Sequence, residues 1–300
     1  MSFFLFPGQG SQKQAMGQDF YERSATAKSV LDEANALFPD GDLLHILFTG
    51  APEEINHTRI AQPGLLAVEV AIARHLMEKG YAPEGCAGHS LGEIPALVIA
   101  GALDFEEAFR LTLVRARLMS ENVPEGAMAA VMGMDADRIE EFLPKGVQVA
   151  NFNGPGQTII SGTKAGVEAA GPALIDAGAK RVVPLPVSGP FHSDLMESAA
   201  NKFAEALAYA PFQNPRIPFI SSVTASQVTE AETIRTLLAE QLYSPVRWTE
   251  VMAEIGPRPA IEVGPGNVLR GLARRMEGAP SVRCAGMVSD VDKLAESGGE

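Results

Sequence analysis

Short apolar segments alternate with stretches of helical periodicity along most of the chain. Strands are predicted where the apolar segments are short and bounded by glycine or proline, at residues 3–6, 85–88, 218–223 and 260–263. Helices are predicted where apolar positions recur every three or four residues, at 63–79, 91–102, 104–122, 194–207 and 232–242, with broken helices over 16–58. Strands that alternate with helices in this way indicate an α/β fold with a parallel sheet.

A self-contained run of elements lies between residues 127 and 187. Strands are predicted at 128–133, 147–153, 157–162 and 180–186, and helices at 135–143 and 164–178. The order βαββαβ is that of a ferredoxin-like unit, with Gly154-Pro155-Gly156 as the turn between its middle strands. We therefore expect an insertion that separates the larger unit into two segments. Residues 244–248, which include the only tryptophan, are expected to form a loop, and residues from about 289 onward a frayed tail.

The chain carries the pentapeptide Gly88-His89-Ser90-Leu91-Gly92 directly after the second predicted strand. This G-x-S-x-G pattern is the sequence form of a nucleophile elbow, in which a serine lies on a sharp turn from strand to helix. The two glycines allow a tight turn and close helix packing, and the helix N-terminus leaves free N–H groups beside the serine oxygen. Glycine and serine are common, so the pentapeptide alone also fits a chance match.

A second glycine-rich segment, Pro-Gly-Gln-Gly-Ser-Gln at residues 7–12, follows the first predicted strand. Such a loop brings backbone N–H groups close to a ligand, and phosphate or an oxyanion is the usual candidate. It lacks the G-K-[ST] ending of a P-loop. The alternative is a plain turn with no role in binding.

Arg115 lies on the apolar face of the helix predicted over residues 104–122. Positions three, four and seven residues away on that face are Ala108, Leu111, Thr112, Leu118 and Met119. Arg117 instead falls on a solvated face, with Glu121 as an i,i+4 partner. A guanidinium that faces a core must find an anion, because it cannot lose its charge. Two alternatives remain open, which are a buried ion pair within the chain and a bidentate clamp for a substrate carboxylate.

Three of the five histidines, His45, His57 and His75, fall on helical or polar surface stretches. His89 adjoins Ser90, but neighbouring side chains in an elbow point in different directions. His192 lies on a loop just before a predicted helix and is by elimination the candidate base for Ser90, although a loop histidine is often only a solvated side chain. No Asp or Glu stands out as a third member, so either it lies elsewhere or a neutral group such as a backbone carbonyl holds the imidazole.

Composition narrows the classes of function. The 300 residues are 46% hydrophobic, which is enough for a full core, and no apolar run approaches the length of a membrane span. The net charge of −13 argues against nucleic acid or an anionic membrane as the main partner. The N-terminus has no basic segment or cleavage site, so we expect a cytoplasmic protein. Cys86 and Cys284 have no ligand-spaced histidines, which predicts a reduced compartment and no metal site.

Six stretches occur together in the order typical of one family. They are residues 6–12, 88–93, 114–119, 151–153, 189–193 and 241–248. Together they resemble the malonyl-CoA:acyl-carrier-protein transacylases, the acyltransferase family of fatty-acid and polyketide synthesis, over nearly the whole chain. The resemblance implies an α/β-hydrolase-like large subdomain, residues 1–126 and 188–300, with an inserted ferredoxin-like small subdomain, residues 127–187.

The resemblance also implies chemical roles. Ser90 would be the nucleophile and His192 the base, and the backbone carbonyl of Gln241 would orient the imidazole. Arg115 would clamp the free carboxylate of malonate. The backbone N–H groups of Gln9 and Leu91 would form the oxyanion hole.

Four further residues are expected to bind substrate on the same grounds: Met119, Asn151, Asn153 and Phe191. Asn151 and Asn153 would line the cleft from the small subdomain. Phe191, directly before His192, resembles the malonyl-selecting form, since relatives that take methylmalonyl groups tend to carry a smaller residue there. Leu91 points to the same preference.

The implied reaction is ping-pong transfer of a malonyl group from malonyl-CoA to the phosphopantetheine thiol of acyl carrier protein. No cofactor is implied, since malonyl-CoA is a substrate and phosphopantetheine belongs to the partner. The alternatives are a thioester hydrolase of the same fold, which has no use for a carboxylate clamp, and a non-catalytic carrier-binding protein. Acyl carrier protein is acidic, so docking needs a basic patch, for which Lys180/Arg181 and Arg270/Arg274/Arg275 are candidates.

Overall fold

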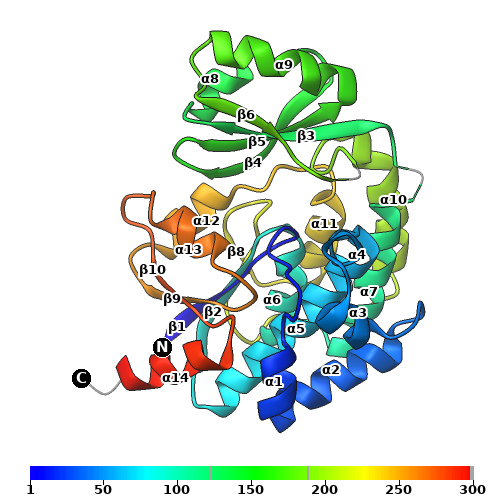
Figure 1. Cartoon of the computed structure of the whole chain (residues 1–300), viewed down its shortest axis with the longest axis vertical. Coiled ribbons are helices and arrows are strands. Elements are labelled where there is room, and N and C mark those ends of the chain that lie inside the picture. The colour runs from blue at the N-terminus through cyan, green and yellow to red at the C-terminus, as the bar shows by residue number, and fades with distance from the viewer. Residues whose placement is uncertain (122, 188, 298–300) are drawn as a thin grey trace.

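The computed structural model describes residues 1–121, 123–187 and 189–297, and Figure 1 shows the chain. Two sheets organise it. The four-stranded sheet and its helices lie at the top of the view, and the six-stranded sheet with the remaining helices lies below. The predicted helix end at residue 122 and the predicted domain boundary at residue 188 fall outside the described residues. No described helix is both long enough and apolar enough to cross a membrane.

The larger sheet has the strand order β10-β9-β1-β2-β7-β8. Its strands are β1 (Ser2–Phe6), β2 (Pro83–Gly88), β7 (Phe219–Ile220), β8 (Gln227–Val228), β9 (Pro259–Glu262) and β10 (Ser281–Cys284). All neighbours pair in parallel except β7 and β8. The mixed α/β class and the parallel sheet are therefore confirmed, whereas β8 and β10 were not predicted from the sequence.

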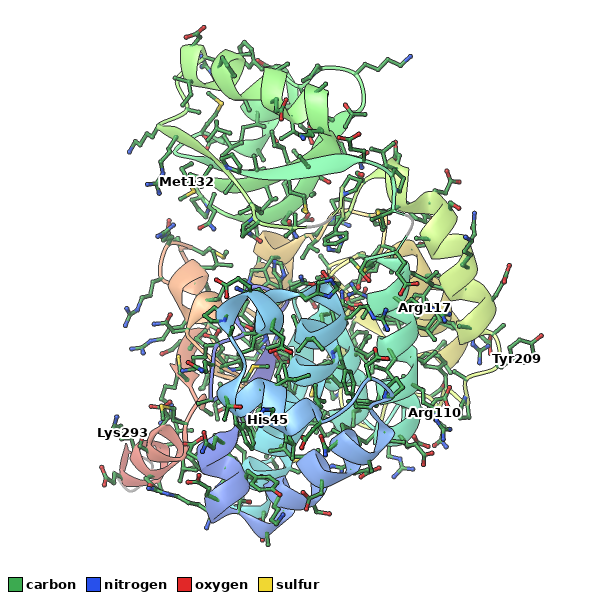
Figure 2. The ribbon with its side chains drawn as sticks, turned by 45° about the vertical axis from the view of Figure 1, so that its right-hand side comes forward. His45, Arg110, Arg117, Met132, Tyr209 and Lys293 are labelled. Carbon is green, nitrogen blue, oxygen red and sulfur yellow. The ribbon has the colours of Figure 1, made fainter. Side chains whose placement is uncertain are left out.

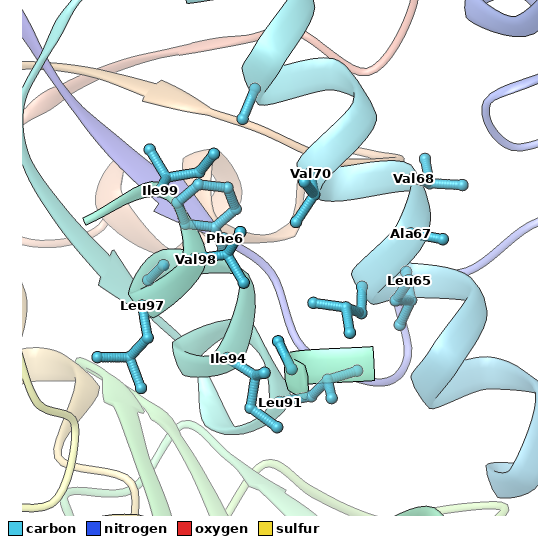
Figure 3. Packing of buried hydrophobic residues seen from close by; sticks show 14 of the residues in the cluster. Phe6, Leu65, Ala67, Val68, Val70, Leu91, Ile94, Leu97, Val98 and Ile99 are labelled. Carbon is cyan, nitrogen blue, oxygen red and sulfur yellow. The ribbon is translucent and has the colours of Figure 1, made fainter. Parts of the chain in front are cut away.

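Helices cover both faces of this sheet. They are α1 (Gln18–Arg23), α2 (Ala25–Leu37), α3 (Leu43–Thr49), α4 (Pro52–Asn56), α5 (Thr58–Glu78), α6 (Glu93–Ile99), α7 (Phe105–Leu118), α10 (Glu197–Leu207), α11 (Ala231–Glu240), α12 (Trp248–Ile255), α13 (Val268–Ala273) and α14 (Val288–Ser297). Side chains alternate along β1, so that Phe4 and Phe6 pack with α5 and α6 while Phe3 and Leu5 pack with α12 and α13. Figure 3 shows Phe6 close to apolar side chains of α5 and α6.

The smaller sheet has the order β4-β5-β3-β6, and every pair in it is antiparallel. Its strands are β3 (Gly126–Met132), β4 (Val147–Gly154), β5 (Gln157–Thr163) and β6 (Arg181–Pro184), and its helices are α8 (Ala136–Glu140) and α9 (Lys164–Asp176). Both helices lie on the side of the sheet away from the larger unit, over a core of their own (Figure 1). The six elements predicted for this region are confirmed with small shifts in their ends.

The two sheets are joined through the segment that precedes α12. The backbone N–H of Phe152 in β4 donates to the carbonyl of Val246 at 2.9 Å, and the N–H of Val246 donates to the carbonyl of Ala150 at 2.8 Å. The hydroxyl of Thr249 donates to the carbonyl of Phe152 at 2.9 Å. The edge strand of the small sheet is thereby paired and covered by the larger unit.

Four predictions from the sequence are wrong. Residues 288–297 form α14, not a frayed tail, because Val291 and Leu294 are buried against the body. Trp248 was assigned to a loop, but it begins α12 and is fully buried. His75 was placed on the surface, but it is buried and its Nδ1 lies 2.9 Å from Oγ of Ser24. Glu121, expected to pair with Arg117, pairs with Arg59 at 2.7 Å instead.

The turn after β2 depends on two glycines that bring backbone into contact with backbone. A Cβ at Gly88 would lie 1.9 Å from the carbonyl carbon of Gly92, and a Cβ at Gly92 would lie 2.1 Å from the carbonyl oxygen of Phe6. Neither atom can move aside as a flexible side chain could. The glycines at these positions are therefore required by packing.

We predict that Gly88→Ala lowers the free energy of unfolding by about 3 kcal/mol or more, because the added methyl group overlaps backbone. Gly271→Ala is the matched control, since a Cβ at this exposed position in α13 meets no atom within 4 Å. The control should change stability by no more than about 1 kcal/mol, in the stabilising direction. Urea denaturation measures both. Equal stability of the two variants would contradict the packing argument.

Candidate active site

Ser90 lies on the turn between β2 and the 3₁₀ turn η1 (Ser90–Gly92), directly before α6. Its φ is 52°, in the left-handed region that non-glycine residues rarely adopt. The side chain is partly exposed, and its Oγ lies 2.8 Å from Nε2 of His192. The G-x-S-x-G segment therefore has the strand, turn and helix context that was predicted, with a base within hydrogen-bonding distance of the hydroxyl.

His192 reaches Ser90 from a loop 102 residues further along the chain. Its φ is 56°, and its backbone N–H donates to the carbonyl of Leu242 at 3.0 Å. Nδ1 lies 2.8 Å from the carbonyl oxygen of Gln241 and 3.1 Å from that of Ser244. Two carbonyl oxygens can only accept, so Nδ1 carries the proton and Nε2 has a lone pair for the serine hydroxyl.

The electrostatic surroundings keep His192 neutral. Burial in the site, and then the nearby charge of Arg115, lower the pKa of His192 to about 3, although the carbonyl of Gln241 acts in the opposite direction. A neutral imidazole can accept a proton at physiological pH. Among the described residues no carboxylate contacts His192, so a backbone carbonyl holds it, which was one of the two arrangements left open by the sequence.

Arg115 is buried at 1% exposure and points at the serine. Its Nη2 donates to Oγ of Ser90 at 3.1 Å and to Oε1 of Gln241 at 2.9 Å. Its Nη1 donates to Oε1 of Gln62 at 2.9 Å. Arg117, two residues away on α7, is exposed as predicted (Figure 2).

The partners of Arg115 are neutral amides. Within the described part of the chain no carboxylate forms an ion pair with its guanidinium, and its buried Nε has no hydrogen-bond partner. Burial lowers its pKa to about 10, opposed by the negative charge of Glu93, so the side chain is cationic at neutral pH. Of the two alternatives from the sequence, the internal ion pair is excluded for the described residues. The charge is left for an anion that enters the site.

The oxyanion hole expected from the sequence consists of two backbone N–H groups, those of Gln9 and Leu91. In the regions that the structure describes, the N–H groups of Gln9 and Leu91 donate to no protein acceptor. The loop that carries Gln9 packs closely on the turn, since a Cβ at Gly8 would lie 2.5 Å from the carbonyl oxygen of His89. The side chain of Gln9 is fixed by Thr58, with Nε2 to Oγ1 at 3.1 Å. The oxyanion-hole role of these two N–H groups stays a prediction.

The residues expected to line the cleft are all buried: Met119, Asn151, Asn153 and Phe191. Nε2 of His89 lies 2.8 Å from Oδ1 of Asn153, so this pair links the turn of the nucleophile to β4, and His89 does not contact the serine hydroxyl in the recorded bonds. Met119 receives a contact from Nε2 of Gln62 at 3.4 Å. Their roles in binding substrate stay predictions.

Sequence reasoning missed Gln62, Glu93 and the side chain of Gln241. Gln241 was expected to act only through its carbonyl, yet its Oε1 holds Arg115 and its Nε2 donates to Glu93 at 2.6 Å. The available signal was a polar residue beside an apolar stretch in each of two helices, Gln62 in α5 and Glu93 in α6, since a buried polar side chain must have a partner.

Comparisons with known proteins extend the argument to the whole chain. The family model described as acyl transferase domain matches residues 3–295. The chain belongs to this acyl transferase family. It is 45% identical over 284 residues to the malonyl CoA-acyl carrier protein transacylase of Bacillus subtilis, with 91% of this chain and 89% of that protein covered. The protein of the same name from Escherichia coli is 44% identical, with 91% and 92% covered.

Solved structures of the family have the same fold. One is the acyl carrier protein S-malonyltransferase of Vibrio cholerae, with a TM-score of 0.92, 41% identity, and 97% of this chain and 98% of that chain covered. Another is a malonyl-transacylase in complex with its type II PKS acyl-carrier protein, with a TM-score of 0.93, 41% identity, and 99% and 100% covered. The predicted family is thereby confirmed.

Among the described residues no cluster of three or more His, Cys, Asp or Glu side chains is arranged to hold a metal ion. Both candidate basic patches are exposed. Lys180 and Arg181 lie at β6, and Arg274 and Arg275 follow α13, where Arg275 donates to Oε1 of Gln157 at 3.2 Å across the junction of the two units. Docking of a carrier protein on either patch stays a prediction.

The lowered pKa of His192 predicts how its reactivity depends on pH. Below pH 6.5, the ordinary histidine pKa, the unfolded chain takes up the proton before the folded protein does, so the contribution of this residue to stability falls as the pH falls. In the folded protein, Ser90 should stay reactive to well below pH 6.5. Arg115→Met removes a positive charge beside the imidazole, so the pKa of His192 should rise and the acidic limit of reactivity should move to higher pH.

The rate at which phenylmethylsulfonyl fluoride modifies Ser90, followed by mass spectrometry across the pH range, measures this limit. Arg117→Met is the matched control, because it removes the same charge from the exposed face of α7. In Arg117→Met the acidic limit of Ser90 modification should be the same as in the unsubstituted protein. An acidic limit that is the same in Arg115→Met and in the unsubstituted protein would contradict the electrostatic argument.

Proposed function

We propose that this protein transfers a malonyl group from malonyl-CoA to the phosphopantetheine thiol of acyl carrier protein. The observation that carries the proposal is a buried guanidinium that has no carboxylate partner among the described residues and whose Nη2 lies 3.1 Å from the serine oxygen. A cation at this position suits an acyl group that ends in a second carboxylate. The names of the relatives from Bacillus subtilis and Escherichia coli agree with this reaction.

The first half-reaction acylates the serine. Nε2 of His192 takes the hydroxyl proton as Oγ of Ser90 attacks the thioester carbonyl carbon of malonyl-CoA. The carbon–sulfur bond then breaks, and the imidazolium returns the proton to the departing thiolate. The products are free CoA and a malonyl ester on Ser90.

The second half-reaction is the same chemistry in reverse order. His192 takes the proton of the phosphopantetheine thiol, and the sulfur attacks the ester carbonyl. The carbon–oxygen bond to Ser90 breaks and the hydroxyl regains its proton. The malonyl group leaves on the carrier protein, and the enzyme returns to its first state.

We assign the oxyanion of both tetrahedral intermediates to the backbone N–H groups of Gln9 and Leu91. Each such donor contributes about 3 kcal/mol to stabilising the transition state. Arg115 binds the free carboxylate of the malonyl group, which distinguishes malonyl from acetyl thioesters and holds the acyl group where an incoming thiol reaches it. Phe191 and Met119 are assigned to the walls around the acyl group, and Asn151 and Asn153 to the side formed by the small sheet.

The architecture belongs to the same proposal. We describe residues 1–126 and 188–300 as an α/β-hydrolase-like subdomain and residues 127–187 as a ferredoxin-like one. The strand order β4-β5-β3-β6 with two helices on one face supports the second description. The expected cytoplasmic location and the absence of a cofactor stay predictions.

The serine adduct tests the function directly. After mixing with malonyl-CoA, the protein should gain one malonyl group by intact mass spectrometry, and Ser90→Ala should gain none. Adding acyl carrier protein should then move the label to the carrier, because the ester is an intermediate. Release of free malonate in place of malonyl carrier would favour the hydrolase, and absence of an adduct on the unsubstituted protein would contradict both enzymes.

Arg115→Ala tests the carboxylate clamp. Loss of a charged contact in a buried site should lower kcat/KM for malonyl-CoA by on the order of 100-fold or more, with a much smaller effect on acetyl-CoA, which has no second carboxylate. Arg117→Ala is the matched control on the exposed face of the same helix. Steady-state kinetics with both thioesters measures the ratio. Retention of full malonyl preference by Arg115→Ala would refute the clamp.

A further inference from the structure

Glu93 is a buried acidic residue that the reaction described above does not use. It is the first residue of α6, three positions after Ser90, and is 1% exposed. Its neighbours along α6 are apolar and buried. A carboxyl group in such a place is costly unless every oxygen has a partner.

Both oxygens of Glu93 accept hydrogen bonds from N–H donors. Oε1 accepts from the backbone N–H of Ser222, and Oε2 accepts from Nε2 of Gln241 at 2.6 Å. Burial raises the pKa of Glu93 to about 7, while these donors act in the opposite direction. An N–H group can only donate, so both contacts use lone pairs of Glu93 and are strongest when its carboxyl group is ionised.

The carboxylate decides how the amide of Gln241 is turned. Because Nε2 of Gln241 donates to Glu93, its Oε1 must face the other way, toward Nη2 of Arg115 at 2.9 Å. The reverse orientation would set an NH₂ group against the guanidinium. Gln62 holds Nη1 of Arg115 in the same manner, so each terminal nitrogen of the guanidinium has one fixed amide acceptor.

We infer that Glu93 is a positioning residue that acts through Gln241 to aim Arg115 at the carboxylate of the incoming acyl group. Glu93 supplies a compensating negative charge that is separated from the guanidinium of Arg115 by the side-chain amide of Gln241. A carboxylate in direct contact would neutralise the arginine, whereas one held behind an amide stabilises the cation and leaves it free to bind. The inference rests on the proposed function, because it concerns the residue assigned to malonate.

The alternative role for Glu93 is structural. Its bond to Ser222 ties α6 to the loop after β7, and this tie could be the reason for its burial. A structural residue would affect stability and all substrates alike. A positioning residue would affect the malonyl group more than an acyl group without a carboxylate, and the two roles are separable by experiment.

The first variant is Glu93→Gln. The new amide can accept from Ser222, which cannot turn, and then presents its own NH₂ to Gln241. The amide of Gln241 must rotate, and Arg115 loses an acceptor. We expect the ratio of kcat/KM for malonyl-CoA to that for acetyl-CoA to fall by on the order of 10- to 100-fold, the cost of a misplaced binding group, with most of the change in KM for malonyl-CoA.

The second variant, Glu93→Gln with Gln241→Glu, reverses the pair. The amide at 93 accepts from Ser222 and donates to the new carboxylate, whose other oxygen accepts from Arg115. Every hydrogen bond is restored, so urea denaturation should give a stability close to that of the unsubstituted protein. The guanidinium now contacts a carboxylate directly, and the malonyl preference should stay lost.

The outcomes separate the roles. Restoration of both stability and malonyl preference by the reversed pair would overturn the inference, as would an unchanged malonyl-to-acetyl ratio in Glu93→Gln. If Glu93→Gln does not fold, the malonyl-to-acetyl ratio of the variant with both Glu93→Gln and Gln241→Glu still distinguishes the two roles. Failure of the proposed function is seen separately, because the unsubstituted protein would then form no malonyl ester on Ser90.

Discussion

The main constraint on this site is a buried cation that no anionic side chain in the described part of the chain contacts. Arg115 is 1% exposed, and its terminal nitrogens donate to two glutamine oxygens and to the serine. Removing a guanidinium from water costs several kcal/mol, and amide dipoles offset only part of that cost. The remainder is offset by Glu93, one hydrogen bond further away. A direct ion pair would neutralise the guanidinium, and the described residues form none with it, which fits the proposal that Arg115 binds an anion.

The serine and the histidine that meet in this site are both held in left-handed backbone. Ser90 has φ 52° and His192 has φ 56°, and each such residue costs on the order of 1 kcal/mol. Close packing of Gly88 on Gly92 fixes the first turn. The backbone at His192 is fixed by the hydrogen bond that its N–H donates to the carbonyl of Leu242. Ser90 and His192, whose side chains meet at 2.8 Å, therefore both keep a strained backbone conformation, because the surrounding backbone holds each of them in place.

The sequence predicted the parts of the site that depend on local pattern. The glycines around Ser90 and the place of Arg115 on the apolar stripe follow from spacing, and both are found in the structure. Glu93 and the side chain of Gln241 could not be predicted in the same way, because they bond to each other across 148 positions of sequence. Periodicity shows which face of a helix is buried, but it does not show which polar groups meet there.

The errors in the fold have a related cause. The final helix α14 was taken for a tail because its composition is polar. Two apolar side chains three positions apart, Val291 and Leu294, are nevertheless buried against the body. Trp248 was assigned to a loop with residues 244–247, but it is buried at the start of α12. In each case a contact with a distant element decided the structure, and such contacts leave little trace in a single sequence.

The small sheet bears on the chemistry through the backbone that positions the base. β4 pairs with Val246, and the same segment supplies the carbonyl of Ser244 and, a few residues earlier, that of Gln241, both of which hold His192. Asn153 of β4 also holds His89, the neighbour of the nucleophile. A shift of the small sheet would therefore move the supports of both the nucleophile and the base. The distance between Oγ of Ser90 and Nε2 of His192 therefore depends on how the two sheets are docked, even though both atoms belong to the larger unit.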